Sequence, residues 1–411
     1  MLLASISEFD PEQTLGRRLW EQACYARRLT CDRPAVRYRG NSPPVRISTQ
    51  LGATMPSAAK TLRVSFVQCR GTAYEIGRAQ ANTFAATRKG KAFLRKKVRS
   101  PGWLNIHTEE RAFRTYAPAL WEEIGGIADG LNIPMEQAVT YFGNDGLRMP
   151  TGGCSAVMSG GVYGRNYDFR PRGYEARFAL VQARGSYASV GGSHQLTGRL
   201  DGMNEHGLAI GLHLVKVRPR FPGLTSTLLV RRVLDSCATT AEAIELLRRL
   251  PHAMKYNYSL LDAGGVAAVV EAGAGAVVVR RGDWLACTNH FQSPQLRRLN
   301  RRVAHSIARL PPLEGWAARG LSAEQTFQAL NFSASPAFHN YGNAQTLHTI
   351  VAEPSKRRLL IGIGGDAAAL DEDMVDVDFN LWVAGEDLPI EQLKGQLNLG
   401  LQPVRRTKAR L

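Results

Sequence analysis

The chain has 411 residues, of which 44% are hydrophobic and 21% are charged. This composition supplies a sizeable apolar core, enough for one large or two smaller domains, and it excludes a chain that is disordered throughout. No segment approaches the roughly 18 to 20 consecutive apolar residues that a membrane-spanning helix needs, so we expect no membrane span.

The formal net charge of +17 raises the question of a nucleic-acid or other polyanionic partner. The charge comes mostly from arginines spread along the chain, and no nucleic-acid-binding motif accompanies them. Scattered arginines are typical of a solvated surface, and they would also suit an acidic substrate such as an acyl-coenzyme A or a carboxylated amide. We therefore do not favour nucleic-acid binding, and we keep a polyanion- or nucleic-acid-binding protein on an inactive enzyme scaffold as the alternative function.

The cysteines indicate neither a metal site nor a disulfide framework. None of the six forms a Cys-x-x-Cys pair, so no structural zinc site is predicted. The first residues, MLLASISEFDPEQ, lack the regions of a secretory signal, so we expect a cytoplasmic protein, in which disulfides are rare. One cysteine is thus available as a nucleophile and the others as small core residues. The six are Cys24, Cys31, Cys69, Cys154, Cys237 and Cys287.

Before Cys154 we expect an irregular segment, then one strand, then mainly helices. Residues 1 to about 60 are rich in Pro, Ser, Arg and Gly without sustained periodicity, apart from a short helix expected at 15–28. A strand follows at 62–71, and amphipathic helices are predicted at 73–97 and 109–131. Pro118 and the Gly125–Gly126 pair should bend or interrupt the second helix.

From Cys154 onward, short apolar segments alternate with glycine turns, which predicts strands. Runs of strands joined by hairpin-like turns favour antiparallel sheets with helices packed outside them. The expected strands are 154–159, 162–169, 177–184, 187–192, 196–203, 208–215, 258–263, 266–272, 276–281, 284–289, 346–354 and 358–364, and the expected helices are 226–237, 240–250, 295–310 and 326–330.

The segment TGGCSAVMS places Cys154 directly after two glycines. Glycine lets another group approach its carbonyl because it has no Cβ, so the thiol could attack the Gly153 carbonyl and move that acyl group from nitrogen to sulfur. Water would then release a chain that begins with Cys154. Its free α-amino group, with a reference pKa of about 7.7 to 8.0, would serve as a general base beside its own nucleophile. The alternative is a buried cysteine that starts a core strand.

The segment GRNYDF places Arg165 and Asp168 three residues apart at a strand end. A guanidinium near the sulfur would favour the thiolate, and a carboxylate near the new amine would orient it. An ordinary surface ion pair is the alternative interpretation.

Five motifs in order resemble those of the acyl-coenzyme A:6-aminopenicillanic-acid acyltransferase family and, more distantly, those of the choloylglycine hydrolases. Both belong to the N-terminal-nucleophile superfamily, and the resemblance runs from about Arg63 to Gly365. APALWEEIGGIADGLNI resembles the helix before the cleavage site, GGCSAV the cleavage site, and GRNYDF the Arg and Asp motif. DGMNEHGLAIGLH resembles the segment that ends in a backbone oxyanion donor, and CTNHF the motif whose asparagine, here Asn289, supplies a side-chain donor.

The resemblance implies an α+β fold, the four-layer αββα sandwich of two antiparallel sheets flanked by helices. It implies a zymogen that cuts itself between Gly153 and Cys154 and becomes an N-terminal-nucleophile cysteine hydrolase or acyltransferase. Such an enzyme acts on a linear amide or an acyl thioester through an acyl-Cys154 intermediate, without metal or cofactor. We favour hydrolysis of a linear amide, since water is always present.

This scheme divides the chain into four regions. They are an N-terminal extension (1–60), a helical pro-segment (61–153), a catalytic domain (154–370) and a closing segment with a basic tail (371–411). The two fragments are expected to stay associated and to bind a small-molecule amide or acyl-coenzyme A, and a homo-oligomer is left open.

One residue departs from the pattern, because choloylglycine hydrolases carry asparagine where this chain has His213. A backbone N–H survives that change, so the oxyanion role can persist near His213. The imidazole itself is either a proton carrier or a hydrogen-bonded strand side chain.

Other candidates are weaker. A conventional cysteine hydrolase that uses His290 or His339 is a rival mechanism and predicts an intact, active chain. Asn204 is expected in a hairpin turn, and Asn257 could face the site. Arg297 and Arg298, on the predicted helix after CTNHF, either bind a substrate carboxylate or face solvent.

Overall fold

The structure is a computed structural model that describes residues 60–95, 105–143, 153–215, 223–273, 275–341, 344–365 and 374–397. The chain divides into two compact units, Met1–Met55 and Pro56–Leu411, and the described residues belong to the second. The predicted N-terminal extension, its helix at 15–28 and the basic tail lie outside the described residues.

The described residues form an α+β fold, as predicted. The helices and helical turns are α2 (Ala73–Ala86), α3 (Arg88–Leu94), α4 (Ile106–Tyr116), α5 (Pro118–Leu131), α6 (Met135–Ala138), η1 (Val139–Gly143), η2 (Pro171–Gly173), α7 (Ser226–Ser236), α8 (Thr240–Arg249), η3 (Arg297–Leu299), α9 (Ala304–Arg319), α10 (Ala323–Asn331), η4 (Pro354–Lys356) and α12 (Phe379–Val383). The strands are β1 (Lys60–Gly71), β2 (Gly153–Ser159), β3 (Val162–Phe169), β4 (Arg177–Ala183), β5 (Ser189–His194), β6 (Gly198–Arg199), β7 (Asp201–Asn204), β8 (Ala209–Leu214), β9 (Tyr256–Leu261), β10 (Ala267–Ala272), β11 (Val277–Gly282), β12 (Trp284–Cys287), β13 (Asn340–Tyr341), β14 (Ala344–Glu353), β15 (Arg358–Gly364), β16 (Met374–Asp378) and β17 (Gln392–Leu397).

Hydrogen bonds arrange most strands in two runs. The first run is β17, β1, β4, β5, β7, β8, β9, β10 and β11. The second is β12, β2, β3, β14, β15 and β16, and a short pairing of β15 with β17 joins the two. Most pairs are antiparallel, as predicted, but β1–β4 and β15–β17 are parallel. A parallel partner needs a long connection, which the helices α2 to α6 and the hairpin β2–β3 supply between β1 and β4.

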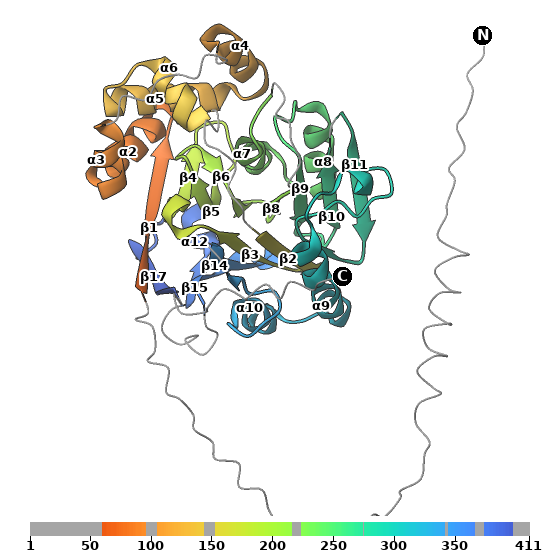
Figure 1. Cartoon of the computed structure of the whole chain (residues 1–411). Coiled ribbons are helices and arrows are strands. Elements are labelled where there is room, and N and C mark those ends of the chain that lie inside the picture. Colours follow the sequence, from red (N-terminus) through yellow and green to blue (C-terminus); the bar gives the residue numbers. More distant parts are fainter. Residues whose placement is uncertain are drawn as a thin grey trace, which may run out of the picture. The chain divides into compact units, whose positions relative to one another are not determined.

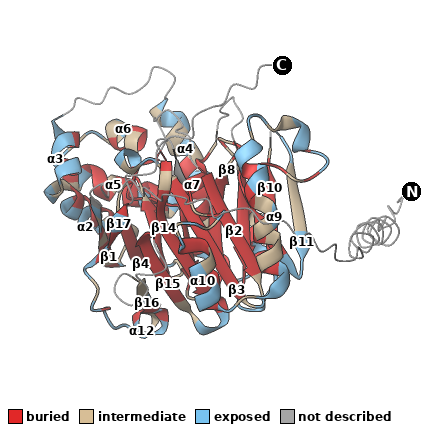
Figure 2. Cartoon of the chain, turned by 60° about the horizontal axis from the view of Figure 1, so that its bottom comes forward, coloured by how far each residue is buried: buried red, intermediate tan, exposed pale blue. Residues whose placement is uncertain are grey.

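Buried side chains form three main apolar clusters that the two runs of strands separate. One lies where α2, α5, α7 and α8 pack against β8, β9 and β10, and another where α9 and α10 pack against β2 and β14. The third contains residues of both runs, including Cys154, Ala156 and Met158 of β2, whereas Val157 belongs to the α9–α10 cluster. This alternation along β2 turns Cys154 toward the interior between the runs. Figure 1 shows α7 and α8 on one side of the strands and α9 and α10 on the other. Figure 2 shows that most strands are buried, whereas β11 is not and helices such as α2 and α3 carry exposed residues.

The helices before the cleavage segment differ from the prediction in two places. The segment 73–97 breaks into α2 and α3 because Thr87, which is extended, caps α3 through a bond from the Gly90 N–H. The second segment breaks at Pro118, as predicted, but Gly125 and Gly126 lie inside an unbroken α5. Gly126 serves close packing instead, because a Cβ there would lie 2.0 Å from the Tyr74 carbonyl oxygen of α2.

The helix predicted at 295–310 is also wrong in its first half. Only η3 forms there, and the α-helix α9 begins at Ala304 and continues to Arg319 through Pro311 and Pro312. Arg302 has a positive φ of 54°, which interrupts a helix. Strands β13, β16 and β17 were not predicted. No helix in the described residues has the length and apolar character to cross a membrane.

A buried ion-pair cluster joins the helices on the two sides of the predicted cleavage site. The Arg231 guanidinium of α7 donates to Glu123 of α5 at 3.0 Å and to Asp235 at 2.7 Å. Gln80 of α2 donates to the same Glu123 carboxylate at 2.6 Å. A buried charge is tolerated only when it is paired, so this cluster ties α2 and α5 to α7.

We expect Glu123→Ala to lower the free energy of unfolding by about 3 kcal/mol, because it leaves the buried Arg231 charge with one carboxylate partner. Urea denaturation would measure the loss. Glu122→Ala is the matched control, since Glu122 is an exposed neighbour on the same helix and should change stability by no more than about 0.5 kcal/mol. Equal losses in the two variants would contradict the assignment.

Candidate active site

Cys154 lies at the start of β2 and is 4% exposed. In the β2–β3 register Gly153 pairs with Asp168, and Cys154 pairs with Tyr167. A Cβ on Gly153 would lie 2.9 Å from Arg309 Nη2 and 3.2 Å from Asp168 Oδ2. A larger residue at 153 would therefore have to shift these buried charged groups, so the glycine leaves the room that they occupy.

Arg165 lies beside the Cys154 sulfur, the position that the sequence interpretation expected for a guanidinium. Its side chain is fully buried, and Nη2 donates to Cys154 Sγ at 3.3 Å and to the Leu212 carbonyl at 2.6 Å. Nη1 pairs with the buried carboxylate of Asp201. The guanidinium is therefore held on three sides, one of which is the thiol.

The protonation of Cys154 depends on opposing effects. Burial raises the pKa of the thiol above its usual value, although the Arg165 guanidinium acts to lower it. The Asp168 carboxylate also raises the pKa of Cys154, while the Asp168 backbone N–H and Arg309 lower it. The cations are therefore the groups that favour the nucleophilic thiolate.

Asp168 and Arg309 meet beside Gly153. Asp168 Oδ1 accepts a hydrogen bond from the Thr346 hydroxyl at 2.7 Å, and Oδ2 lies 3.4 Å from Arg309 Nη1. Burial raises the pKa of Asp168 to about 6, although Arg309, the Thr346 hydroxyl and Arg165 all act to lower it. Arg309 Nη1 also donates to the Ser155 hydroxyl at 2.7 Å, so this pair brackets the start of β2.

Asn289 contacts the nitrogen of Cys154. Its Oδ1 accepts hydrogen bonds from the Cys154 N–H and from Arg309 Nη2, both at 2.7 Å. Its backbone N–H donates to the Ser306 hydroxyl at 2.7 Å. Within the described residues Nδ2 is buried without a hydrogen-bond partner. The amide therefore contacts the Cys154 nitrogen through its oxygen, while its Nδ2 is left with hydrogen-bond donors that no described residue uses.

His213 is fully buried on β8. Its Nε2 lies 2.9 Å from the Ser259 hydroxyl, which lies 2.9 Å from the Tyr163 hydroxyl. Burial, followed by Arg165, lowers the pKa of His213 well below its usual value, while a hydrogen bond with the Cys154 backbone acts to raise it. The imidazole thus lies beside Cys154 as a neutral, hydrogen-bonded group rather than as a cation.

The rival histidines have other contacts. His290 Nδ1 lies 2.8 Å from the Ser306 hydroxyl and 3.0 Å from the Thr288 hydroxyl, and burial, Arg280 and Arg309 lower its pKa to about 4. The His339 backbone N–H donates to the Thr346 hydroxyl at 2.9 Å. The side chain that hydrogen-bonds to Cys154 Sγ is Arg165.

The side chains of the weaker candidates Asn204 and Asn257 hydrogen-bond to backbone groups. Asn204 ends β7, and its Oδ1 accepts from the Leu208 N–H at 3.1 Å, as expected for a hairpin turn. Asn257 Nδ2 donates to the carbonyls of Thr288 at 3.1 Å and His290 at 2.8 Å, so it holds the two residues that flank Asn289.

Arg297 and Arg298 lie exposed on η3, in agreement with the solvent-facing alternative.

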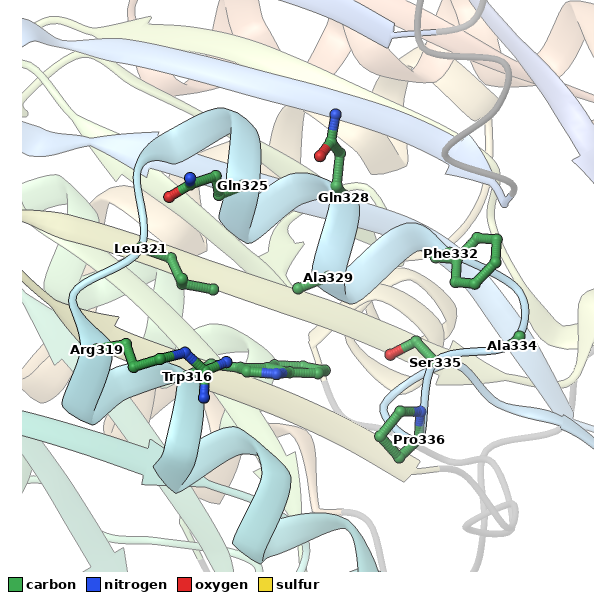
Figure 3. Close-up of a pocket in the computed structure, with 10 residues that line it drawn as sticks. All are labelled: Trp316, Arg319, Leu321, Gln325, Gln328, Ala329, Phe332, Ala334, Ser335 and Pro336. Carbon is green, nitrogen blue, oxygen red and sulfur yellow. The ribbon is translucent and has the colours of Figure 1, made fainter.

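A separate groove of about 780 Å³ lies on α9, α10 and the residues after α10. Figure 3 shows Trp316 and Arg319 of α9 facing Phe332, Ser335 and Pro336 across it. It is lined by Trp316, Arg319, Leu321, Gln325, Gln328, Ala329, Phe332, Ala334, Ser335 and Pro336. No side chain of the Cys154 cluster lines it, so we do not assign it to the reaction.

Among the described residues, no three or more His, Cys, Asp and Glu side chains are grouped so that they could hold a metal ion.

A buried thiol with a guanidinium on its sulfur, an amide on its nitrogen and a carboxylate beside the preceding glycine has the parts of a thiol acyl-transfer site. The sequence profile of the acyl-coenzyme A:6-aminopenicillanic acid acyl-transferase family matches residues 157–368. The match covers more than half of the chain, and the chain belongs to this family. A search of curated proteins finds no match.

Several solved structures resemble the chain at low identity. Penicillin V acylase from Agrobacterium tumefaciens is 20% identical with a TM-score of 0.36, and the match covers 56% of this chain and 86% of that one. A variant of conjugated bile acid hydrolase from Clostridium perfringens is 14% identical with a TM-score of 0.38, over 62% of this chain and 100% of that one. The N-acylethanolamine-hydrolyzing acid amidase ortholog of Caenorhabditis elegans is 15% identical with a TM-score of 0.37, over 49% and 93%.

Sequence reasoning missed Arg309, which contacts Asp168, Ser155 and Asn289. A signal was present, because the buried positions of α9 include Ser306, Arg309 and Leu313 along one face, and a charged residue in such a stripe marks a polar site. The apolar residues Ile307 and Leu310 lie beside this stripe in sequence and obscure it, and Ile307 proves to be 51% exposed.

Asp168 should make stability depend on pH. Its pKa is raised from an ordinary value of 3.8 to about 6, so the folded state holds the proton more tightly than the unfolded state does. The stabilisation that results is lost as pH rises from about 4 through about 6. In a Cys154→Ala chain, we expect the free energy of unfolding to fall over this window by about 3 kcal/mol relative to the same chain with Asp168→Asn. Urea denaturation at a series of pH values would test this. Parallel pH curves for the two chains would contradict the assignment.

Proposed function

We propose that this protein is an autoproteolytically activated N-terminal cysteine amidohydrolase or acyltransferase that acts on a linear amide or an acyl thioester through an acyl-Cys154 intermediate. The observation that carries the proposal is that both reactive atoms of Cys154 already have partners. Arg165 donates to the sulfur at 3.3 Å, and Asn289 accepts from the nitrogen at 2.7 Å. Family membership supports the same class of reaction.

The first reaction is maturation. The Cys154 thiol attacks the Gly153 carbonyl, the Gly153–Cys154 amide bond breaks, and the acyl group becomes a thioester on the sulfur. Water hydrolyses this thioester, which leaves a carboxylate on Gly153 and a free thiol and α-amine on Cys154. Asp168 and Arg309 lie within van der Waals reach of Gly153, where they can position its carbonyl and the new carboxylate.

Turnover would follow the same chemistry on an external substrate. The free α-amine of Cys154 takes the thiol proton while the sulfur attacks the substrate carbonyl. Asn289 Nδ2 and a backbone N–H near His213 stabilise the oxyanion, and the leaving group departs with the proton. Asp168 positions the amine and Arg165 the sulfur. Water then releases the acyl group as a free acid.

Hydrolysis and transfer differ in the molecule that resolves the acyl-enzyme. We propose hydrolysis of a linear amide as the main reaction because water is always present. Incubation with an acyl donor and trial amines would separate the two, since free acid as the main product supports hydrolysis and new amide supports transfer.

Two structural proposals accompany the function. The three apolar clusters support a four-layer αββα sandwich in which helices flank two stacked sheets. The position of β1 between β17 and β4, together with the Glu123–Arg231 pair, supports two fragments that remain associated after cleavage.

Intact mass of the purified protein tests maturation. We expect cleavage of the 411-residue chain after Gly153, which gives fragments of 153 and 258 residues, the second being 411 less 153. Cys154→Ala should remain a single chain because it lacks the attacking sulfur. An uncut wild-type chain of 45.1 kDa with full amidase activity would rule out this mechanism in favour of a conventional cysteine hydrolase.

Asn289→Ala tests the oxyanion donor. We expect a fall in kcat on the order of 10² to 10³, since one preorganised N–H donor is lost. Asn204→Ala is the matched control, because it removes a buried asparagine with turn contacts, and it should lower stability without changing kcat per folded molecule. Equal kcat values for Asn289→Ala and the wild type would remove Asn289 from the mechanism.

A further inference from the structure

A continuous chain of buried polar contacts leads away from Cys154 through Arg165. The Arg165 guanidinium pairs with Asp201, Asp201 Oδ2 lies 2.9 Å from His348 Nε2, and His348 Nδ1 lies 2.8 Å from the Tyr174 hydroxyl. Arg165, Asp201 and His348 are fully buried, and Tyr174 is 1% exposed. No sequence motif indicated a role for Asp201, His348 or Tyr174, and the proposed reaction does not use them.

The chain of contacts crosses between the two runs of strands. Arg165 lies on β3 and His348 on its neighbour β14, whereas Asp201 lies on β7 of the other run. Asp201 Oδ1 accepts a further bond from the Gly192 N–H of β5 at 3.3 Å. Burial alone would raise the pKa of Asp201, but His348 and Arg165 outweigh it and lower the pKa, so the carboxylate is held in its charged form.

Two glycines make room for this arrangement. A Cβ on Gly211 would lie 2.3 Å from Arg165 Cδ, and a Cβ on Gly192 would lie 2.9 Å from Asp201 Oδ1 and 3.1 Å from His348 Cε1. Such distances exclude a side chain at either position unless the network moves. The local backbone is therefore fitted to these three polar side chains.

Aromatic rings fix the His348 imidazole. The Tyr167 ring stacks on it with centroids 5.0 Å apart and an interplanar angle of 21°, and Phe178 meets it edge-on at 5.1 Å. Tyr167 also lies under the Arg165 guanidinium at 5.4 Å. The imidazole has little freedom to turn away from Asp201.

We propose that Asp201, fixed by His348 and Tyr174, is a positioning residue that holds one edge of the Arg165 guanidinium so that its Nη2 faces the Cys154 sulfur. This inference rests on the proposed function, because it matters only if Cys154 is the nucleophile. The physical reason is that a planar guanidinium fixed along one edge has the direction of its other N–H groups fixed as well. The network thereby sets how strongly one cation favours the thiolate.

His348 is a good position for a test because its own ring contacts are with Asp201, Tyr174, Tyr167 and Phe178, and it reaches the sulfur through Asp201 and Arg165 and through the Tyr167 ring. The charged groups that face Cys154 are Arg165, Asp168 and Arg309, and the substitution retains all three. It also retains the titratable neighbours of Cys154, which are His213, Tyr167 and Cys287. His348→Leu removes the donor to Asp201, whereas His348→Gln retains an amide N–H that can reach a carboxylate. If His348 only filled space, His348→Leu and His348→Gln would have the same effect on the Cys154 thiol, whether or not the hydrogen bond to Asp201 is restored.

The experiment measures the rate at which iodoacetamide alkylates Cys154 as a function of pH, with mass spectrometry of the Cys154 peptide. We expect His348→Leu to raise the midpoint by on the order of one pH unit, because Asp201 loses its His348 partner and holds the Arg165 guanidinium less firmly beside the sulfur. In His348→Gln the midpoint should return most of the way to the wild-type value. In an Arg165→Lys chain, which keeps the charge but loses the planar fork, His348→Leu should add little further shift.

Asp235→Asn is the control, because Asp235 is another buried carboxylate that pairs with an arginine, Arg231, at 2.7 Å. It should lower stability without moving the midpoint. Tyr174→Phe, which keeps the ring and removes the hydroxyl, should give a smaller upward shift and serves if His348→Leu does not fold. An unchanged midpoint in folded His348→Leu would overturn the proposal, as would an unchanged midpoint in Tyr174→Phe if that variant has to be used instead. A shift in Asp235→Asn as large as the shift in the test variant would also overturn it.

The same mass spectra keep the two hypotheses separate. The alkylated peptide either begins with Cys154 or still contains Gly153, which reports maturation, while the midpoint is defined in both forms. Variants are compared within one form. Failure of self-cleavage would thus count against the proposed function, and a missing shift would count against the positioning role.

Discussion

The rest of the site depends on the contacts of the Arg165 guanidinium. It is fully buried between two runs of strands and joins the Cys154 sulfur, the Leu212 carbonyl and the Asp201 carboxylate. A charge in such a position is tolerated only because it is paired and because each of its neighbours is held in place. Gly211 leaves the space that its side chain fills, so the fold supplies both the partner and the room.

The other half of the site is assembled from segments that are distant in sequence. Asn289 follows β12 and reaches the Cys154 nitrogen, while Arg309 on α9 reaches Asn289, Asp168 and the Ser155 hydroxyl. Asn257 and Ser306 fix the backbone around Asn289 from opposite directions. The sulfur and the nitrogen of Cys154 are therefore contacted by separate groups, the sulfur by Arg165 of β3 and the nitrogen by Asn289 of the segment after β12.

Much of the fold was readable from the sequence because glycine turns and apolar alternation mark short strands directly. The sequence pointed to Arg165, Asp168 and Asn289 because each lies in a compact motif beside a strand end, and the structure places all three next to Gly153 and Cys154. Arg309 was not found, because its partners come from other elements and the apolar residues around it suggest an ordinary helix. Asp201 and His348 were missed for a related reason, since a buried ion pair between two strand runs leaves no local pattern. The parallel pairing of β1 with β4 was missed because register across a long connection is a tertiary property.

The place of β1 has a consequence for how the protein must be made. It lies between β17 and β4 and belongs to the part of the chain before Gly153. A gene that encoded only the portion from Cys154 onward would leave the backbone groups of both neighbours exposed along open edges, which promote aggregation. Synthesis as one continuous polypeptide supplies this strand in the same molecule as its partners, so under the proposed cleavage the uncut chain would serve as the template for assembly of the two fragments.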